Sequence, residues 1–364
     1  QTDDPSVAGS SDPTTFTVVQ TAPAVRIALG EALGMPVGEI VTGKMTSALR
    51  LLGFDRVFDT DFTADLTIME EGFELIKRVK EGGVLPQLPS CSPGWIKFIE
   101  HFYPELLPNV SSCKSPQQMF GALAKTYFAE QAGVDPAQMK VVSIMPCVAK
   151  KFEAARPEMC DSGYRDVDYV LTTRELAQMI KEKGIEFAAL PESDYDDPLG
   201  ESTGAAVIFG ATGGVMEAAL RTAYEVLTGE RLEDVNIEAV RGMEGVREAT
   251  VMVGDLPVKA AVAHGLANAA QVLDKIVAGE ADYHFIEIMC CPGGCLGGGG
   301  QPIPTSPEIR KQRAAAIYQA DRDLPIRRSH ENPSIKAIYE KFLGEPLSHK
   351  SHHLLHTEYT PRTR

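Results

Sequence analysis

Short β-rich runs alternate with helical patterns along most of this sequence, and this alternation restricts the fold more than any other feature. The β-rich runs, each ending at small or special residues, span 15–23, 140–147, 258–265 and 283–290. Helical periodicity follows at 66–80, 116–131, 173–183, 214–228 and 265–278. Strand–loop–helix alternation predicts an α/β fold with largely parallel, twisted sheets flanked by helices. In such sheets ligands gather at the carboxyl ends of the strands.

The chain divides into a short leader and one large domain. Residues 1–15 are polar and rich in Pro and Ser, which predicts a linker. Residues 16–364 are interpreted as one functional domain with two lobes, at about 16–140 and 141–364, and the active site between them. From about Pro307 the sequence turns helical and charged, which predicts a C-terminal helical wrap.

Charge and cysteine content exclude several classes of protein. With 35 basic and 50 acidic side chains the net charge is -15, which argues against nucleic acid or an anionic membrane as partner. No apolar run is long enough to cross a bilayer, and there is no secretory signal. Seven cysteines is an odd number for a disulfide framework, so metal or redox use in a reducing compartment is favoured, with a cytoplasmic location.

Cysteines gather in three loops rich in Gly and Pro. The loops read "LPSCSPGW" (88–95), "SIMPCVAKKFE" (143–153) and "IEIMCCPGGCLGGGGQP" (286–302). Glycine lets the backbone approach a bulky inorganic core, and loop N–H groups stabilise charge on sulfur. An iron–sulfur cluster is therefore favoured. A zinc site, which usually shows C-x2-C pairs that are absent here, and inert buried thiols are the alternatives.

The three loops, in this order, resemble the signature motifs of the FeFe (iron-only) hydrogenases. Further stretches resemble the catalytic domain of the same family: "TAPAVRIALGEALGMPVG", "FDTDFTADLTIMEE", "CKSPQQM", "GATGGVMEAALR" and "RRSHENPSI". The resemblance runs from about residue 16 to the C-terminus. It implies reversible reduction of protons to dihydrogen.

The resemblance also implies the cofactor, an H-cluster. This is a 4Fe–4S cubane joined through a cysteine sulfur to a two-iron unit with CO, cyanide and a bridging dithiolate amine. Cys147, Cys291 and Cys295 match cubane ligands, and Cys295 matches the bridging one.

The fourth ligand is open, because the usual adjacent cysteine pair of the first loop is here Cys91-Ser92. A serine hydroxyl is a poor iron ligand, since its proton is harder to remove than that of a thiol. Cys91 is the favoured fourth ligand, with proton relay falling to Ser92 or water. Ser92 itself and Cys290, where relatives usually have alanine, are the alternatives.

Other residues match pocket positions of the family. Lys150 matches the lysine that binds a cyanide ligand, although its pairing with Lys151 alone suggests a surface site. Ala24 replaces a serine found in some relatives, so one hydrogen bond to cyanide is expected to be missing. The remaining matches are Pro23, Ser115, Pro116, Gln117, Met145, Phe209, Gly210 and Met289. From spacing alone, Met145 and Met289 would be read as core residues.

A route for protons is implied in the same way. Glu71, Glu74 and Arg78 share one stripe of a predicted helix, which by spacing alone is more typical of a solvated face. By resemblance they match, together with Ser111, a relay from the surface to the cluster. General acid–base transfer needs such groups at hydrogen-bond separation, so both glutamates are expected to be partly buried.

The implied partners supply electrons and assemble the cofactor. The sequence lacks the C-x2-C-x2-C-x3-C runs of ferredoxin-like domains. Electrons are therefore expected from a ferredoxin, from iron–sulfur clusters on a partner subunit, or from an N-terminal region that is missing. The diiron unit requires a maturation machinery. The alternative functions are a non-catalytic iron–sulfur assembly protein of the same fold and a sensory hydrogenase.

Overall fold

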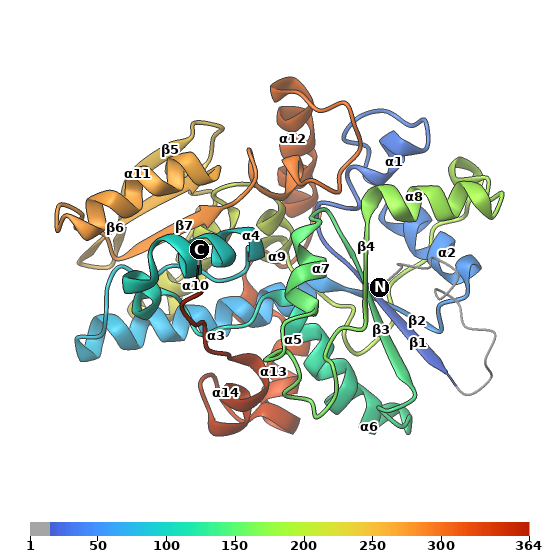
Figure 1. Cartoon of the computed structure of the whole chain (residues 1–364), viewed down its shortest axis with the longest axis horizontal. Helices are drawn as coiled ribbons and strands as arrows, with labels where there is room; N and C mark the ends of the chain where they lie inside the picture. Colours follow the sequence, from blue (N-terminus) through green and yellow to red (C-terminus); the bar gives the residue numbers. More distant parts are fainter. Residues whose placement is uncertain (1–14, 364) are drawn as a thin grey trace.

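The structure is a computed structural model that describes residues 15–363. These residues form two β-sheets with helices on their faces (Figure 1). One sheet has four strands in the order β2-β1-β3-β4, and the other has three in the order β5-β6-β7. This confirms the predicted α/β fold with largely parallel sheets. The predicted linker lies outside the described residues except for its last residue.

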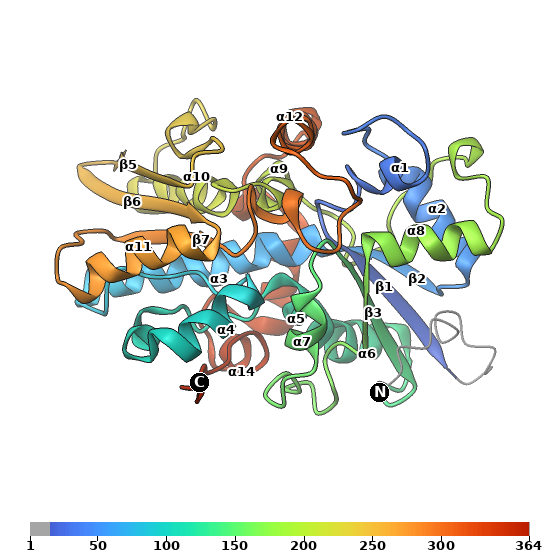
Figure 2. The ribbon, with the colours of Figure 1, turned by 45° about the horizontal axis from the view of Figure 1, so that its top comes forward.

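The four-stranded sheet is parallel throughout and buried. Its strands are β1 (Phe16–Thr21), β2 (Arg56–Asp59), β3 (Met139–Met145) and β4 (Tyr169–Thr172). β3 reads "MKVVSIM" with six of its seven residues buried, as expected for a strand covered on both faces. Helices α2 (Thr42–Leu52) and α8 (Thr173–Glu182) lie over one face, and α5 (Pro116–Leu123) and α6 (Ala129–Ala132) over the other (Figures 1 and 2).

The order of this sheet creates a crevice beside β1. From β1 the chain continues to β2 on one side, whereas β3 pairs with the other side of β1. Connections leaving in opposite directions open a gap at the carboxyl ends of the two strands, which is where α/β proteins bind ligands. The segments that follow β1 and β3 begin with Ala22-Pro23 and Pro146-Cys147.

The three-stranded sheet is mixed. β5 (Val246–Val253) is antiparallel to β6 (Leu256–His264), and β6 is parallel to β7 (Phe285–Met289) through helix α11 (Leu266–Val277). Alternate residues of β7 face opposite sides: Phe285 and Met289 join one core, and Ile286 and Ile288 join another with α4 (Pro93–Phe102) and α11. β7 therefore delivers the third cysteine loop from a strand held on both faces.

Helix α3 (Thr60–Glu81) joins the two halves of the molecule. Phe62 and Leu66 pack in the core of the four-stranded sheet, whereas Ala64 and Ile68 pack with α10 (Gly214–Thr228) and the three-stranded sheet. Its buried Glu70 binds the C-terminal segment, accepting hydrogen bonds from Tyr339 and Ser351 and lying 3.0 Å from His356 Nε2. The predicted C-terminal wrap is therefore present and anchored on α3.

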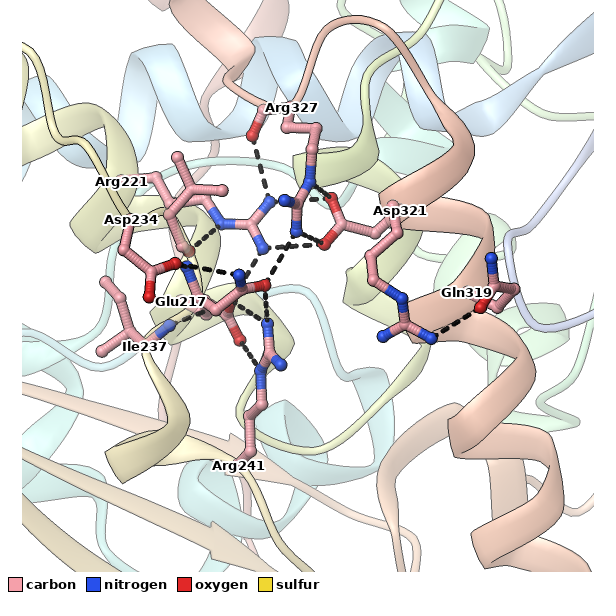
Figure 3. Close-up of polar contacts among 11 residues, drawn as sticks. Glu217, Arg221, Asp234, Ile237, Arg241, Gln319, Asp321 and Arg327 are labelled. Atoms are coloured by element: carbon pink, nitrogen blue, oxygen red, sulfur yellow. Dashed lines mark hydrogen bonds and ion pairs between the residues drawn. The ribbon is translucent and has the colours of Figure 1, made fainter.

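A buried network of ions joins α10 to α12 (Pro307–Asp323) and the loop after it (Figure 3). Arg221 lies 2.7 Å from Glu217 and 2.9 Å from Asp321, and all three side chains are fully buried. Arg241 and Arg327 complete the network from the rim, each 2.6 Å from one of these carboxylates. Two buried carboxylates thus share three guanidinium groups.

Each predicted β-rich run and helical segment contains a strand or helix, and 116–131 is one helical stretch in which η3 (Ala124–Phe128) joins α5 to α6. The strands β2, β4 and β5 were not predicted, nor, among the longer helices, were α2 and α4. The division into lobes near residue 140 stays a prediction.

The remaining helical segments are α1 (Leu29–Ala32), η2 (Pro104–Asn109), α7 (Ala149–Ala154), η4 (Phe187–Ala189), α9 (Gly204–Val207), η5 (Ile208–Gly210), η6 (Glu238–Val240), η7 (Gly294–Gly297), η8 (Ser329–Glu331), α13 (Pro333–Ile338), η9 (Tyr339–Leu343) and α14 (His349–Leu355).

Within residues 15–363, no helix has both the length and the apolar character that a membrane span requires.

Candidate active site

The three cysteine loops meet around one cavity. This cavity has a volume of about 80 Å³ and is partly open to solvent. Cys91 of the first loop, Cys147 of the second, and Cys291 and Cys295 of the third all line it. So do the two alternatives considered for the fourth ligand, Ser92 and Cys290. The seven cysteines, all within the described residues, are free thiols.

Close packing of the backbone brings the second and third loops together. Gly300 N–H donates a 2.8 Å hydrogen bond to Pro146 O. A Cβ atom on Gly298 would lie 2.2 Å from the same carbonyl oxygen, which is closer than any side chain tolerates. The glycines of the third loop thus let Cys295 approach Cys147 across the gap between the sheets.

Lys150 extends from α7 into the wall of the cavity. Its ammonium donates to Cys91 O at 3.0 Å and to Glu153 Oε2 at 2.8 Å. The same Glu153 oxygen accepts hydrogen bonds from Ser115 Oγ (2.9 Å) and Gln117 Nε2 (3.2 Å). The surface reading of Lys150 is therefore wrong: this ammonium is buried, and a buried carboxylate balances its charge.

Pocket residues from the sequence fall into two groups. Pro23, Pro116, Gln117, Met145, Phe209 and Met289 line the cavity. Ala24, Ser115 and Gly210 are buried just behind the lining: a Cβ on Gly210 would lie 3.5 Å from Ala24 Cβ, and Ser115 holds Glu153. The lining is apolar apart from Lys150, Gln117, Thr60, Ser92 and the thiols.

The residues of the expected proton route lie together beside α3, and hydrogen bonds join its outer part from Arg78 to Ser111. Arg78 Nη2 lies 2.7 Å from Glu74 Oε1, and Ser111 Oγ donates to Glu74 Oε2 at 2.6 Å. Ser111 also hydrogen-bonds Glu71, which acts electrostatically on Cys91. Glu71 is buried and Glu74 half-buried, as expected. Glu71 Oε1 has no hydrogen-bond partner among the described residues.

Burial dominates the acid–base properties of this chain of groups. Desolvation, reinforced by the nearby Glu74 carboxylate, raises the pKa of Glu71 to about 8. Glu71 is therefore protonated near neutral pH and able both to donate and to accept a proton. Burial raises the pKa of the Cys91 thiol well above its ordinary value, with Glu71 adding to the effect.

The thiols of the cavity suit a cationic, sulfur-binding group. Burial raises the pKa of Cys147, and it raises that of Cys295 to about 12, with the neighbouring thiols adding to the shift. Iron replaces the proton of a thiol and supplies the missing positive charge, so these sites match iron–sulfur ligation chemically. The apolar walls and the buried Lys150 provide room and one positive charge for a further anionic ligand.

Sequence reasoning missed several residues of the site. Glu153 lies three residues after Lys150, so i, i+3 spacing could have revealed the pair. Thr60 and Ala64 line the cavity from the first turns of α3, and no motif marks them. Glu287 of β7 is also buried; it accepts hydrogen bonds from Gly213 N (2.6 Å) and Met216 N (2.8 Å) and so caps α10 beside the third loop.

Comparison with known proteins gives concordant matches. A family model described as the C-terminal domain of the iron only hydrogenase large subunit matches residues 15–299. A second, described as the iron hydrogenase small subunit, matches residues 307–362. Among curated proteins, the NADP-reducing hydrogenase subunit HndD of Solidesulfovibrio fructosivorans is 57% identical over 361 residues, or 97% of this chain. The chain spans 62% of the length of that relative.

A solved structure of a single-residue variant of the [FeFe]-hydrogenase HydA1 from Chlamydomonas reinhardtii superimposes with a TM-score of 0.87. It is 46% identical in sequence, and the match covers 98% of this chain and 97% of that one. More distant relatives, at 30% to 35% identity, are named as cytosolic iron–sulfur assembly proteins or as NAR1.

Proposed function

Because the chain belongs to the iron-only hydrogenase family, we propose that it catalyses the reversible reduction of protons to dihydrogen at an H-cluster. One observation carries the proposal: a largely apolar cavity lined by the sulfurs of Cys91, Cys147, Cys291 and Cys295 lies at the end of a chain of proton-exchanging groups. When bound, the H-cluster would supply the electrons and the open iron position at which protons are reduced.

Different residues of the chain would have different roles around the H-cluster. We assign Cys147, Cys291 and Cys295 to the cubane, with Cys295 as the sulfur shared with the diiron unit. Lys150, held by Glu153, would keep one positive charge against the cyanide ligands. Met145, Met289, Phe209 and Pro23 would exclude water.

Proton exchange would run along α3. Arg78 holds Glu74 at the outer end, Ser111 bridges Glu74 and Glu71, and Glu71 lies beside Cys91. The raised pKa of Glu71 supports this role, because an acid that titrates near the working pH transfers protons in both directions.

Electrons would come from a ferredoxin or from an iron–sulfur partner subunit, and dedicated maturation proteins would insert the diiron unit. The relative HndD, a subunit of an NADP-reducing hydrogenase, supports a partner subunit. Seven free thiols support a reducing, cytoplasmic location.

Infrared spectroscopy of protein produced together with maturation proteins tests the proposal, alongside hydrogen production from a reduced low-potential dye. Metal-bound CO and cyanide bands with gas turnover are expected. A protein that holds a cubane but shows neither would instead match the iron–sulfur assembly relatives.

A further inference from the structure

At one end of the cavity, the first loop carries a serine and the third loop carries an additional cysteine. The family motif expects a cysteine where this chain has Ser92, and Cys290 directly precedes the ligand Cys291. Cys290 N–H donates a 3.2 Å hydrogen bond to Ser92 Oγ, although the two residues are 198 positions apart. The serine hydroxyl is thus engaged with the backbone of the third loop, and the two side chains lie next to each other.

The Cys290 sulfur lies against the first turn of α4, beside Ser92. A Cβ atom on Gly94 would come within 2.6 Å of Cys290 Sγ, so only glycine leaves room for this sulfur. α4 begins at Pro93, directly after Ser92. A thiol carried by the third loop thus occupies space next to the position where the first loop normally provides one.

The surroundings of Cys290 and Cys91, the two candidate thiols, differ. Cys290 shares a hydrogen bond with the Cys291 thiol and lies within electrostatic range of Cys147 and Cys295. All three assigned cubane cysteines therefore act on the Cys290 thiol. For Cys91 the largest electrostatic influences are Glu71 and Lys150, followed by Cys295. Glu71 and Lys150 thus act more strongly on Cys91 than Cys295 does, whereas the groups that act on Cys290 are the cubane cysteines.

From this arrangement, and resting on the proposed function, we propose that Cys290 is the fourth thiolate ligand of the cubane and that Cys91 remains a free thiol for proton exchange. The sequence alone favoured Cys91 as the ligand. A sulfur bound to iron has no proton to exchange, so ligation by Cys91 would end the route from Glu71 one step before the cofactor. Ligation by Cys290 keeps the thiol of Cys91 beside Glu71, whose Oε1 has no hydrogen-bond partner among the described residues.

The test uses the full chain produced without maturation proteins, so that only a cubane is inserted. Iron and sulfide per protein, and the electron paramagnetic resonance spectrum of the reduced cubane, are measured for wild type, Cys290→Ala and Cys91→Ala. Cys160→Ala, which removes an exposed thiol outside the cavity, is the matched control. Circular dichroism and the melting temperature report on folding.

Cys290→Ala should lower cubane content at least about tenfold, since loss of even a residue that only supports a metal ligand costs that much. Cys91→Ala should retain the cubane and its spectrum. After maturation, its hydrogen turnover should fall about 100-fold or more, as expected for loss of a proton-transfer group. The double variant Ser92→Cys with Cys290→Ala should recover the cubane, which separates loss of a ligand from a general folding defect.

Other outcomes contradict the proposal in distinct ways. Loss of the cubane in Cys91→Ala but not in Cys290→Ala would make Cys91 the ligand. Full cubane content in both variants would leave Ser92 or water at the fourth iron. A wild-type protein that takes up no cubane at all would refute the proposed function itself.

Discussion

Ser111 Oγ donates a 2.6 Å hydrogen bond to Glu74 Oε2 and so joins the loop before α5 to helix α3. Ser111 is fully buried, whereas Glu74 reaches the surface beside Arg78. The contact therefore connects the exterior to Glu71, which lies deeper and hydrogen-bonds the same serine. A single hydroxyl that bridges two carboxyl groups can pass a proton by rotating.

Replacing Ser111 by alanine should interrupt proton exchange without removing the cofactor. Hydrogen turnover should fall about 100-fold, the lower end of the range for general acid–base groups, while iron content stays at the wild-type level. Ser47→Ala is the control, since the Ser47 hydroxyl also hydrogen-bonds a carbonyl, Pro191 O at 2.6 Å, but belongs to α2 and takes no part in the proposed proton route. Wild-type turnover in Ser111→Ala would mean that protons take another route.

Glu71 should make stability fall as pH rises. Its pKa is about 8 in the folded chain and ordinarily 4.5, so both states hold the proton below pH 4.5 and its contribution is then complete. Between pH 4.5 and 8 only the folded state keeps the proton, and folding becomes less favourable as pH rises through this window.

Glu71→Gln lacks this titration. Relative to wild type it should gain stability from pH 5 to pH 8, by up to about 5 kcal/mol for a shift of this size. Its hydrogen turnover should be lower throughout. Melting temperatures of both proteins in the same cluster state, measured across this range, check the prediction; parallel pH profiles would show that Glu71 titrates normally.

Lys150→Met should reduce binding of the diiron unit while leaving the cubane in place. The substitution removes the ammonium that faces the cavity, so the CO and cyanide infrared bands should weaken strongly while cubane iron remains. It also leaves Glu153 with an unbalanced buried charge, at a cost of about 3 kcal/mol. The double variant Lys150→Met with Glu153→Gln should recover stability but not the infrared bands. Lys151→Ala, the neighbouring lysine outside the cavity lining, is the control.

The buried ion network between α10 and α12 should be a main source of stability. Arg221→Met leaves Glu217 and Asp321 without their shared guanidinium, which should destabilise the fold by about 3–5 kcal/mol. Lys275→Ala removes a pair with Glu248 in which both side chains are about half exposed, and should cost less than about 1 kcal/mol. Thermal unfolding of the two variants measures the difference. Equal melting temperatures would show that Arg241 and Arg327 compensate.

The sequence could predict those parts of the site that depend on residues close together in the sequence, but not those that depend on contacts between distant segments. Cys147 and Cys291 follow strands directly, so the position of both at the carboxyl ends of parallel strands could be predicted. The stripe of Glu71, Glu74 and Arg78 could also be read from helical spacing, but its burial could not, because the loop carrying Ser111 covers it.

Other features needed the folded chain. The contact of Cys290 with Ser92 joins loops from separate elements, and no local pattern specifies it. β2 and β4 have four residues each, too few to show a period. Helix α4 was missed although Pro93 stands at its first position, a common start signal.

The third loop needs glycine because its backbone packs closely against the second loop, and a single substitution can test this. A methyl group on Gly298 would lie 2.2 Å from Pro146 O, so Gly298→Ala must push the third loop away from the second. Cys295 and Cys147 stand on opposite sides of this contact, and their separation should grow. Cubane content should therefore fall at least about tenfold, as for a disturbed metal site. Gly72→Ala is the matched control, because a methyl group there meets no atom within 4 Å and its helix favours alanine. If Gly298→Ala held as much iron as Gly72→Ala, close approach of these loops would not be what brings the sulfurs together.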